Sequence, residues 1–174
     1  MTERPAPRAD PVDTPWALRR VERPDPEWYR GLFRRIGTDW LWTSRLRLSD
    51  EDLARVIRRT EVEVYTLRLA ERDEGLLELA FRAAGECELA FFGLTPGLVG
   101  RGAGRWLMNR AIDIAWSRPI GRFWVHTCSF DHPAALPFYL RSGFRAYRRE
   151  VEIADDPRLD GTLPRAAAPH VPIV

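Results

Sequence analysis

Hydrophobic and polar residues follow two different periods along the chain. Leu32, Phe33 and Ile36 recur at helical spacing, whereas after residue 61 apolar side chains such as Val62 and Val64 occupy every second position, as in a half-buried strand. Turn residues and helix caps set the limits of each element. The pattern predicts, in chain order, a strand at 16–21, helices at 27–36 and 49–58, strands at 61–71, 76–82 and 87–94, a helix at 102–116, a strand at 122–128, a helix at 133–141 and a strand at 144–153.

This order predicts one α/β domain with a mixed central sheet of six to seven strands flanked by about four helices. The chain of 174 residues is long enough to bury a full core in a single domain. Residues 1–15 are polar and proline-rich, so we expect a disordered arm there. The folded domain is expected over 16–154, followed by a proline-rich tail at 155–174.

Composition excludes several classes of protein. The 27 basic residues are nearly balanced by 25 acidic ones, so the chain lacks the strong positive charge that is typical of nucleic-acid-binding proteins. Every basic side chain is an arginine, which removes a phosphate-binding or Schiff-base lysine and leaves backbone and arginine to hold any phosphate. No apolar run reaches 18 residues, so we expect a cytoplasmic protein without a membrane segment. His126 and Cys128 have no further ligands at metal spacing, and no metal site is expected.

A glycine-rich segment follows the strand predicted at 87–94. Gly100, Gly102 and Gly104 stand where the next helix begins, and free N–H groups at a helix start make an anion site that suits a pyrophosphate. Arg101 and Arg105 could reach phosphates as well. The alternative is a tight turn without a ligand. A dinucleotide site is disfavoured, because the third glycine of G-x-G-x-x-G is missing in either register.

Two motifs resemble the GNAT superfamily of N-acetyltransferases over about residues 87–144. Val99-Gly100-Arg101-Gly102-Ala103-Gly104 is similar to the family's Gln/Arg-x-x-Gly-x-Gly/Ala, with Val99 in the first position. The segment from Asp131 to Phe144 is similar to Asn-x-x-Ala-x-x-x-Tyr-x-x-x-Gly-Phe, with Asp131 in place of the asparagine. The resemblance implies a GNAT fold and transfer of an acetyl group from acetyl-CoA to a primary amine, by direct attack in a ternary complex.

The resemblance also implies roles for individual residues. It assigns Tyr139 as the general acid that protonates the leaving thiolate, which agrees with the chemistry of a phenol. Residues that would contact the donor are Phe92, Leu94, Val99, Gly100, Arg101, Gly102, Ala103, Gly104, Arg105, Asp131 and Phe138. Asp131 fits equally well as a helix N-cap.

The base that must deprotonate the incoming amine is less well defined. Glu88 is our candidate, because its strand lines the acceptor side in the family, with Glu86 or a water molecule as the alternative. Backbone N–H groups near Phe92 and Leu94, splayed by a bulge at Gly93, would polarise the thioester carbonyl.

The acceptor itself is not identified by the sequence. Trp40, Trp42 and Arg45 lie in the region that builds the acceptor pocket in the family, although simple packing also explains the tryptophans. We expect a small-molecule or peptide amine. A second hypothesis is a non-catalytic module that binds acyl-CoA or regulates another protein. Edge strands and the proline-rich tail leave a homodimer open.

Overall fold

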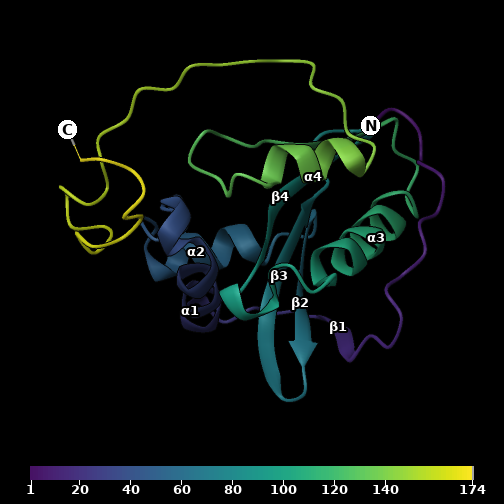
Figure 1. Ribbon diagram of the computed structural model, residues 1–174, viewed down its shortest axis with the longest axis horizontal. Helices are drawn as coiled ribbons and strands as arrows, with labels where there is room; N and C mark the ends of the chain where they lie inside the picture. The colour runs from purple at the N-terminus through teal and green to yellow at the C-terminus, as the bar shows by residue number, and fades with distance from the viewer. Residues whose placement is uncertain (174) are drawn as a thin grey trace.

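The computed structural model describes residues 1–173, which form a five-stranded mixed sheet with helices on both faces (Figure 1). The elements are β1 (Trp16–Arg20), α1 (Pro26–Gly37), η1 (Thr38–Trp40), α2 (Asp50–Ile57), β2 (Val62–Leu69), β3 (Arg72–Ala80), β4 (Glu86–Leu94), η2 (Pro96–Leu98), α3 (Ala103–Ala115), β5 (Arg122–Val125) and α4 (Ala135–Arg141). The strands lie in the order β1-β2-β3-β4-β5, antiparallel except for the parallel pair β4 and β5.

Local capping explains where the first two helices begin. The Asp25 side chain accepts hydrogen bonds from the N–H groups of Glu27 and Trp28, and Pro26 occupies the first turn of α1. Ser49 Oγ accepts a hydrogen bond of 3.1 Å from the N–H of Asp52 and so caps α2. Both helix starts were predicted from the sequence.

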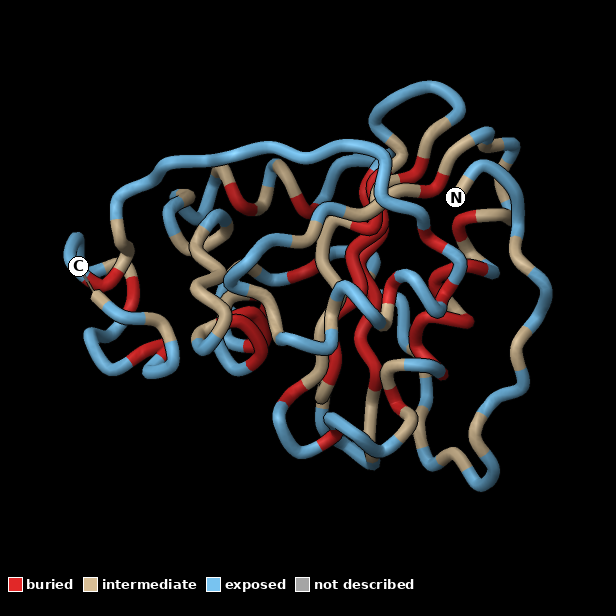
Figure 2. The backbone as a smooth tube through the Cα atoms, turned by 45° about the horizontal axis from the view of Figure 1, so that its top comes forward, coloured by how far each residue is buried: buried red, intermediate tan, exposed pale blue. Residues whose placement is uncertain are grey.

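The alternation along the strands separates two hydrophobic cores, one on each face of the sheet. Val62 and Val64 of β2 pack with residues of α1 and α2, whereas Tyr65 and Leu67 of the same strand pack with residues of α3. Figure 2 shows the central strands as the most deeply buried part of the chain. The sheet thus isolates the α1–α2 side from the side that carries α3 and α4.

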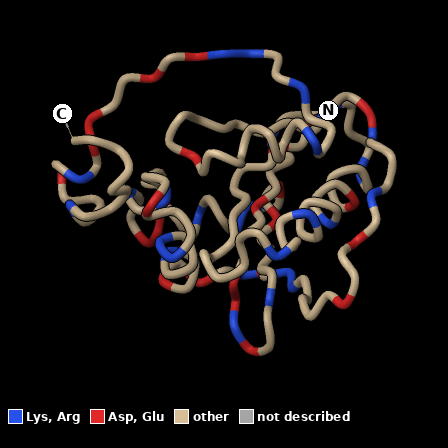
Figure 3. The backbone as a smooth tube through the Cα atoms, viewed as in Figure 1, with Lys and Arg blue, Asp and Glu red and all other residues tan. Residues whose placement is uncertain are grey.

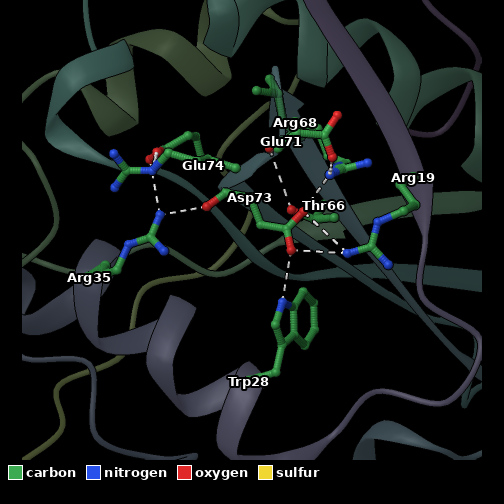
Figure 4. Close-up of polar contacts among 10 residues, drawn as sticks. Arg19, Trp28, Arg35, Thr66, Arg68, Glu71, Asp73 and Glu74 are labelled. Carbon is green, nitrogen blue, oxygen red and sulfur yellow. Dashed lines mark hydrogen bonds and ion pairs between the residues drawn. The ribbon is translucent and has the colours of Figure 1, made fainter.

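Asp73, at the start of β3, ties the β2–β3 hairpin to the rest of the domain (Figure 4). Its carboxylate accepts hydrogen bonds from Arg19 of β1 at 3.0 Å and from the indole N–H of Trp28 of α1 at 2.9 Å. Arg68 of β2 lies 3.5 Å from the same carboxylate. Because the three partners come from different elements, this contact fixes the hairpin relative to both β1 and α1.

The most buried charge in the domain is the carboxylate of Glu78 on β3, which is 0% exposed. Tyr29 of α1 donates its hydroxyl to Oε2 at 2.5 Å, and Arg45 donates a guanidinium N–H to Oε1 at 2.6 Å. Burial and the Glu78 charge together raise the pKa of Tyr29, so that this phenol remains a donor. A buried charge is tolerated here because both of its oxygens are bonded.

The sixth strand predicted at 144–153 is absent, and the expectation of six to seven strands was wrong. Residues 145–155 are exposed and pair with no strand; they cross the molecule as an extended span (Figure 2). Apolar and charged side chains are mixed along this span, but such a segment forms a strand only where a sheet edge is available to pair with it. On the free side of β5, the N–H of Phe123 instead donates to the carbonyl of Met1.

Both terminal segments make specific contacts without forming helices or strands. Residues 1–15 run along α3, where Arg4 pairs with Asp113 at 2.7 Å. Residues 156–173 turn around the buried Arg158, which donates hydrogen bonds to the carbonyls of 167, 168, 171 and 172. Within residues 1–173, no helix has the length and apolar composition required to cross a membrane.

We predict that Glu78→Ala lowers the free energy of unfolding by about 3–5 kcal/mol, because it leaves Arg45 buried without its partner. Urea denaturation followed by tryptophan fluorescence would measure the loss. Glu71→Ala is the matched control: its side chain is 93% exposed and, among residues 1–173, pairs only with Arg68, so the expected loss is about 0–1 kcal/mol. Equal losses in the two variants would contradict the role assigned to Glu78.

Candidate active site

The candidate site lies where β4 and β5 separate. The two strands pair from Glu86 with Arg122 to Leu89 with Val125, and β4 then continues to Leu94 without a partner on that side. The N–H and C=O groups of β4 that face this gap are therefore not used by the sheet. Such a strand end can offer backbone donors to a ligand.

A β-bulge in β4 coincides with the start of the separation. Against β3, the register passes from Leu89 opposite Leu79 to Phe91 opposite Glu78, so that Ala90 is the extra residue. Ala90 and Phe91 consequently both pack toward the α1–α2 side, while Phe92 returns to the other face. The bulge predicted at Gly93 was thus misplaced by three residues.

Gly93 has a different structural role. A Cβ at this position would lie 2.3 Å from Ile36 of α1 and 3.0 Å from the Trp42 ring. The glycine therefore permits α1 and the segment after it to approach β4 closely.

The glycine-rich segment forms a turn that ends at the start of α3. Gly100 and Gly102 have φ values of 80° and 85°, in the left-handed region where glycine has no steric penalty. Gly102 is the N-cap of α3, and no side chain caps the helix. The N–H groups of the first turn, which have no partner within an α-helix, remain free for an anion. This arrangement fits the pyrophosphate of a CoA thioester.

Basic side chains flank this helix start. Arg101 and Arg105 are exposed, and neither forms an ion pair within residues 1–173. Elsewhere, basic and acidic positions are interspersed along the chain (Figure 3). The N-terminal arm lies beside the same turn, since a Cβ on Gly102 would lie 3.0 Å from Pro11.

Four of the residues predicted to contact the donor meet at this helix start. The Phe92 and Phe138 rings stack with centroids 5.6 Å apart, which brings α4 onto the end of β4. A Cβ on Gly104 would lie 3.8 Å from both Leu94 and Phe138. Val99, by contrast, is 49% exposed.

Tyr139 lies beside this group, on α4. Its ring packs against Phe92, Phe138 and Phe144 at centroid distances of 6.4, 5.6 and 5.8 Å. Burial, with a contribution from the Asp131 carboxylate, raises the pKa of Tyr139 well above its usual range, so the phenol stays protonated at neutral pH. Within the described residues its hydroxyl forms no hydrogen bond. A phenol hydroxyl without a protein partner can donate its proton to a ligand.

The two carboxylates considered as the base each pair with an arginine. Glu88 lies 3.5 Å from Arg82, and Glu86 lies 3.4 Å from Arg122. Alternation with Cys87 and Leu89, which pack on the α3 side, places both carboxylates on the face that carries α1 and α2.

The residues predicted to bind the acceptor differ in what surrounds them. Arg45 is bonded to Glu78, and its guanidinium lies 4.8 Å from the Phe91 ring, so its charge is already compensated. Trp42 packs between Phe33 and Phe91, at 5.2 and 5.4 Å.

The indole N–H of Trp42 points to Asp131, whose Oδ1 lies 3.4 Å away. Trp40 meets His132, with ring centroids 4.9 Å apart. The sequence did not predict these two contacts between the segment after α1 and the segment before α4. No local signal links residues so far apart in the chain.

Comparison with known proteins identifies the fold. A family model described as "Acetyltransferase (GNAT) family" matches residues 22–144, and no curated protein gives a significant match. The aminoglycoside acetyltransferase meta-AAC0020 from an uncultured soil metagenomic sample, crystallised with trehalose, superposes with a TM-score of 0.65 at 15% identity over 83% of this chain and 98% of its own.

Two further solved structures are similar. For AAC(6')-Iy in complex with a bisubstrate analogue, CoA-S-monomethyl-acetylneamine, the TM-score is 0.61 at 14% identity, covering 80% of this chain and 97% of that one. For an acetyltransferase from Trypanosoma brucei it is 0.57 at 22% identity, covering 80% and 99%. With the family model spanning most of the strands and all four helices, the chain belongs to the GNAT acetyltransferase family, whose members are acyl-CoA-dependent transferases.

Proposed function

We propose that the protein is an N-acetyltransferase that moves an acetyl group from acetyl-CoA to a primary amine by direct attack in a ternary complex. The observation that carries this proposal is the proximity of an uncapped α3 N-terminus to Tyr139, whose ring is buried and whose hydroxyl has no hydrogen-bond partner among the described residues. The crystallised relatives that act on aminoglycosides support an amine as the acceptor.

The donor would bind with its pyrophosphate at the first turn of α3, where the backbone N–H groups converge. Arg101 and Arg105 supply charge for the phosphates, and Phe92, Leu94 and Phe138 supply apolar contact for the arm of the donor that leads to the thioester. This assignment uses the residues predicted from the glycine-rich motif, which the fold brings to one end of β4.

The chemistry requires one bond to form and one to break. The neutral amine attacks the thioester carbonyl, the C–N bond forms, and the C–S bond then breaks as the oxyanion collapses. Free N–H groups of β4 near Phe92 and Leu94 stabilise the oxyanion. Tyr139 delivers its proton to the departing sulfur, and solvent restores the phenol.

Glu88 is the proposed base, acting directly or through water. Its pairing with Arg82 at 3.5 Å is long, so the carboxylate keeps acceptor capacity for the ammonium proton. Glu86 remains the alternative.

The same ion pairs favour a second candidate function, a non-catalytic acyl-CoA-binding module. Both candidate carboxylates of β4 pair with an arginine, so neither Glu86 nor Glu88 is a free carboxylate in the structure. Release of CoA thiol with any amine separates the two functions, since a binding module gives none.

Donor binding is expected to depend on Gly102. Gly102→Glu places a carboxylate at the helix start, and repulsion from a phosphate at about 4 Å would weaken acetyl-CoA binding by about a hundredfold or more. Isothermal titration calorimetry measures the change. Gly161→Glu is the matched control. Gly161 has a φ of 79°, so the substitution causes the same left-handed strain, and it adds the same charge away from the site. Loss of binding in both variants would contradict the assignment.

Tyr139→Phe tests the proton donor. We expect kcat to fall by about 10²–10⁴-fold, because the thiolate must then leave unprotonated. The dissociation constant for acetyl-CoA should hardly change, since the ring and its packing remain. Steady-state kinetics with a thiol reagent gives kcat, and Tyr147→Phe, on the exposed span, serves as the control. A normal kcat in Tyr139→Phe would remove this residue from the mechanism.

A further inference from the structure

The N-terminal arm, which is residues 1–15, packs along one face of α3 (Figure 1). Its Pro11 lies next to Gly102, the residue at which α3 begins, since a Cβ on Gly102 would lie 3.0 Å from the proline ring. The family model matches residues 22–144, so the arm lies outside the matched region. What the arm brings to α3 is therefore a property of this chain and not of the family model.

A buried asparagine on α3 fixes the position of the arm. The Asn109 side chain is 8% exposed, and within residues 1–173 all of its hydrogen bonds go to the arm. Its amide N–H groups donate to the Arg8 carbonyl at 3.0 Å and to Asp10 Oδ1 at 2.9 Å, and its Oδ1 accepts from the Arg8 guanidinium at 3.1 Å. Because a buried amide is costly to leave without partners, these bonds hold Arg8 against α3.

The guanidinium of Arg8 has no acidic partner within the described part of the chain. Besides the asparagine, it donates to Ser142 Oγ at 3.1 Å and to the Arg141 carbonyl at 3.5 Å, so that its acceptors are neutral. The carboxylate of Asp10, two residues along the arm, pairs with Arg110 instead. A guanidinium has five N–H donors, so Arg8 keeps an uncompensated charge and donors that are still free.

Helix geometry places Arg8 beside Arg105. Residues four apart in an α-helix are neighbours on one face, with Cβ atoms about 5–6 Å apart. Asn109, which holds Arg8, follows Arg105 by this spacing. Burial lowers the pKa of Arg8, and the nearby charge of Arg105 lowers it further. Arg8 therefore adds a positive charge to that of Arg105 in the first half of α3.

Two like charges held together without a counter-charge repel each other, and an anion between them removes the repulsion. The planar fork of a guanidinium is well matched to phosphate oxygens. The chain contains no lysine, so arginine supplies all of its permanently charged basic side chains. The proposed function places the donor's pyrophosphate at the start of α3, and CoA carries a further phosphate on its ribose. A phosphate of the donor is thus the anion that this pair of arginines fits.

We propose that Arg8 is a phosphate-binding residue of the donor site, brought to α3 by the N-terminal arm. The inference rests on the proposed function, because it names the ligand as a CoA thioester. Docking of the arm and binding of the donor then strengthen each other, since each supplies the charge that the other compensates, and this coupling is reciprocal.

Isothermal titration calorimetry of the full chain with CoA tests the role of Arg8. Arg8→Gln should weaken CoA binding about tenfold, as expected for the loss of one hydrogen bond between charged groups. Arg8→Lys keeps the charge and should restore most of the affinity. Arg4→Gln is the matched control, because it removes the same charge from the same arm, where Arg4 pairs with Asp113 about 12 Å beyond Arg105 along α3. It should leave CoA binding unaltered, and thermal unfolding checks that each variant is folded.

Two further ligands show which phosphate Arg8 holds. Dephospho-CoA lacks the ribose phosphate, and inorganic pyrophosphate lacks everything else. If Arg8 binds the ribose phosphate, wild type and Arg8→Gln bind dephospho-CoA equally. If it binds the pyrophosphate, the variant loses about tenfold with every ligand. Removal of residues 1–12 should weaken CoA binding at least as much as Arg8→Gln, whereas tighter binding would show that the arm obstructs the donor, and would overturn the inference.

The outcomes separate this inference from the proposed function. Equal CoA binding by wild type and folded Arg8→Gln removes Arg8 from the donor site but leaves the acetyltransferase proposal intact. An affinity for CoA or pyrophosphate that depends on Arg8, and not on Arg4, supports the phosphate contact even where no acetyl transfer is found. A folded wild type that binds neither ligand overturns both.

Discussion

The structure depends most on the point at which β4 and β5 cease to pair. Their parallel ladder ends at Leu89 and Val125, and a bulge at Ala90 turns β4 just beyond it. Unused backbone groups along the rest of β4 would be costly if they were buried without partners. The separation therefore leaves backbone groups of β4 open to a ligand. The start of α3 and the α4 side chains lie on one side of this gap, and the segment after α1 lies on the other.

Buried charge connects the α1 side of the domain to the sheet. Glu78 lies under α1 and bonds Tyr29 and Arg45, so the segment that follows α1 is attached to the middle of the sheet. Such a pair adds little net stability compared with apolar packing, but loss of one partner leaves an uncompensated charge. It also gives Arg45 a structural role, because its guanidinium pairs with Glu78 and lies over the Phe91 ring.

The acid and base sides of the proposed reaction are arranged differently. Tyr139 is enclosed by three aromatic rings and keeps its proton, which suits a residue that donates once as the sulfur departs. The β4 carboxylates stand on the opposite face, each next to an arginine.

The sequence by itself determined the order of the strands and α-helices between Trp16 and Arg141, the caps of α1 and α2, and the glycine-rich start of α3, because these follow from local periodicity, side-chain capping and backbone freedom. Tertiary structure decided the rest. Residues 144–153 form no strand because pairing requires a neighbouring edge, and the bulge lies at Ala90 rather than Gly93 because register depends on β3. Likewise, the pairing of Arg45 with Glu78 and of Trp42 with Asp131 joins residues 33 and 89 positions apart. Contacts at such separations are set by packing of the whole domain, which no local pattern encodes.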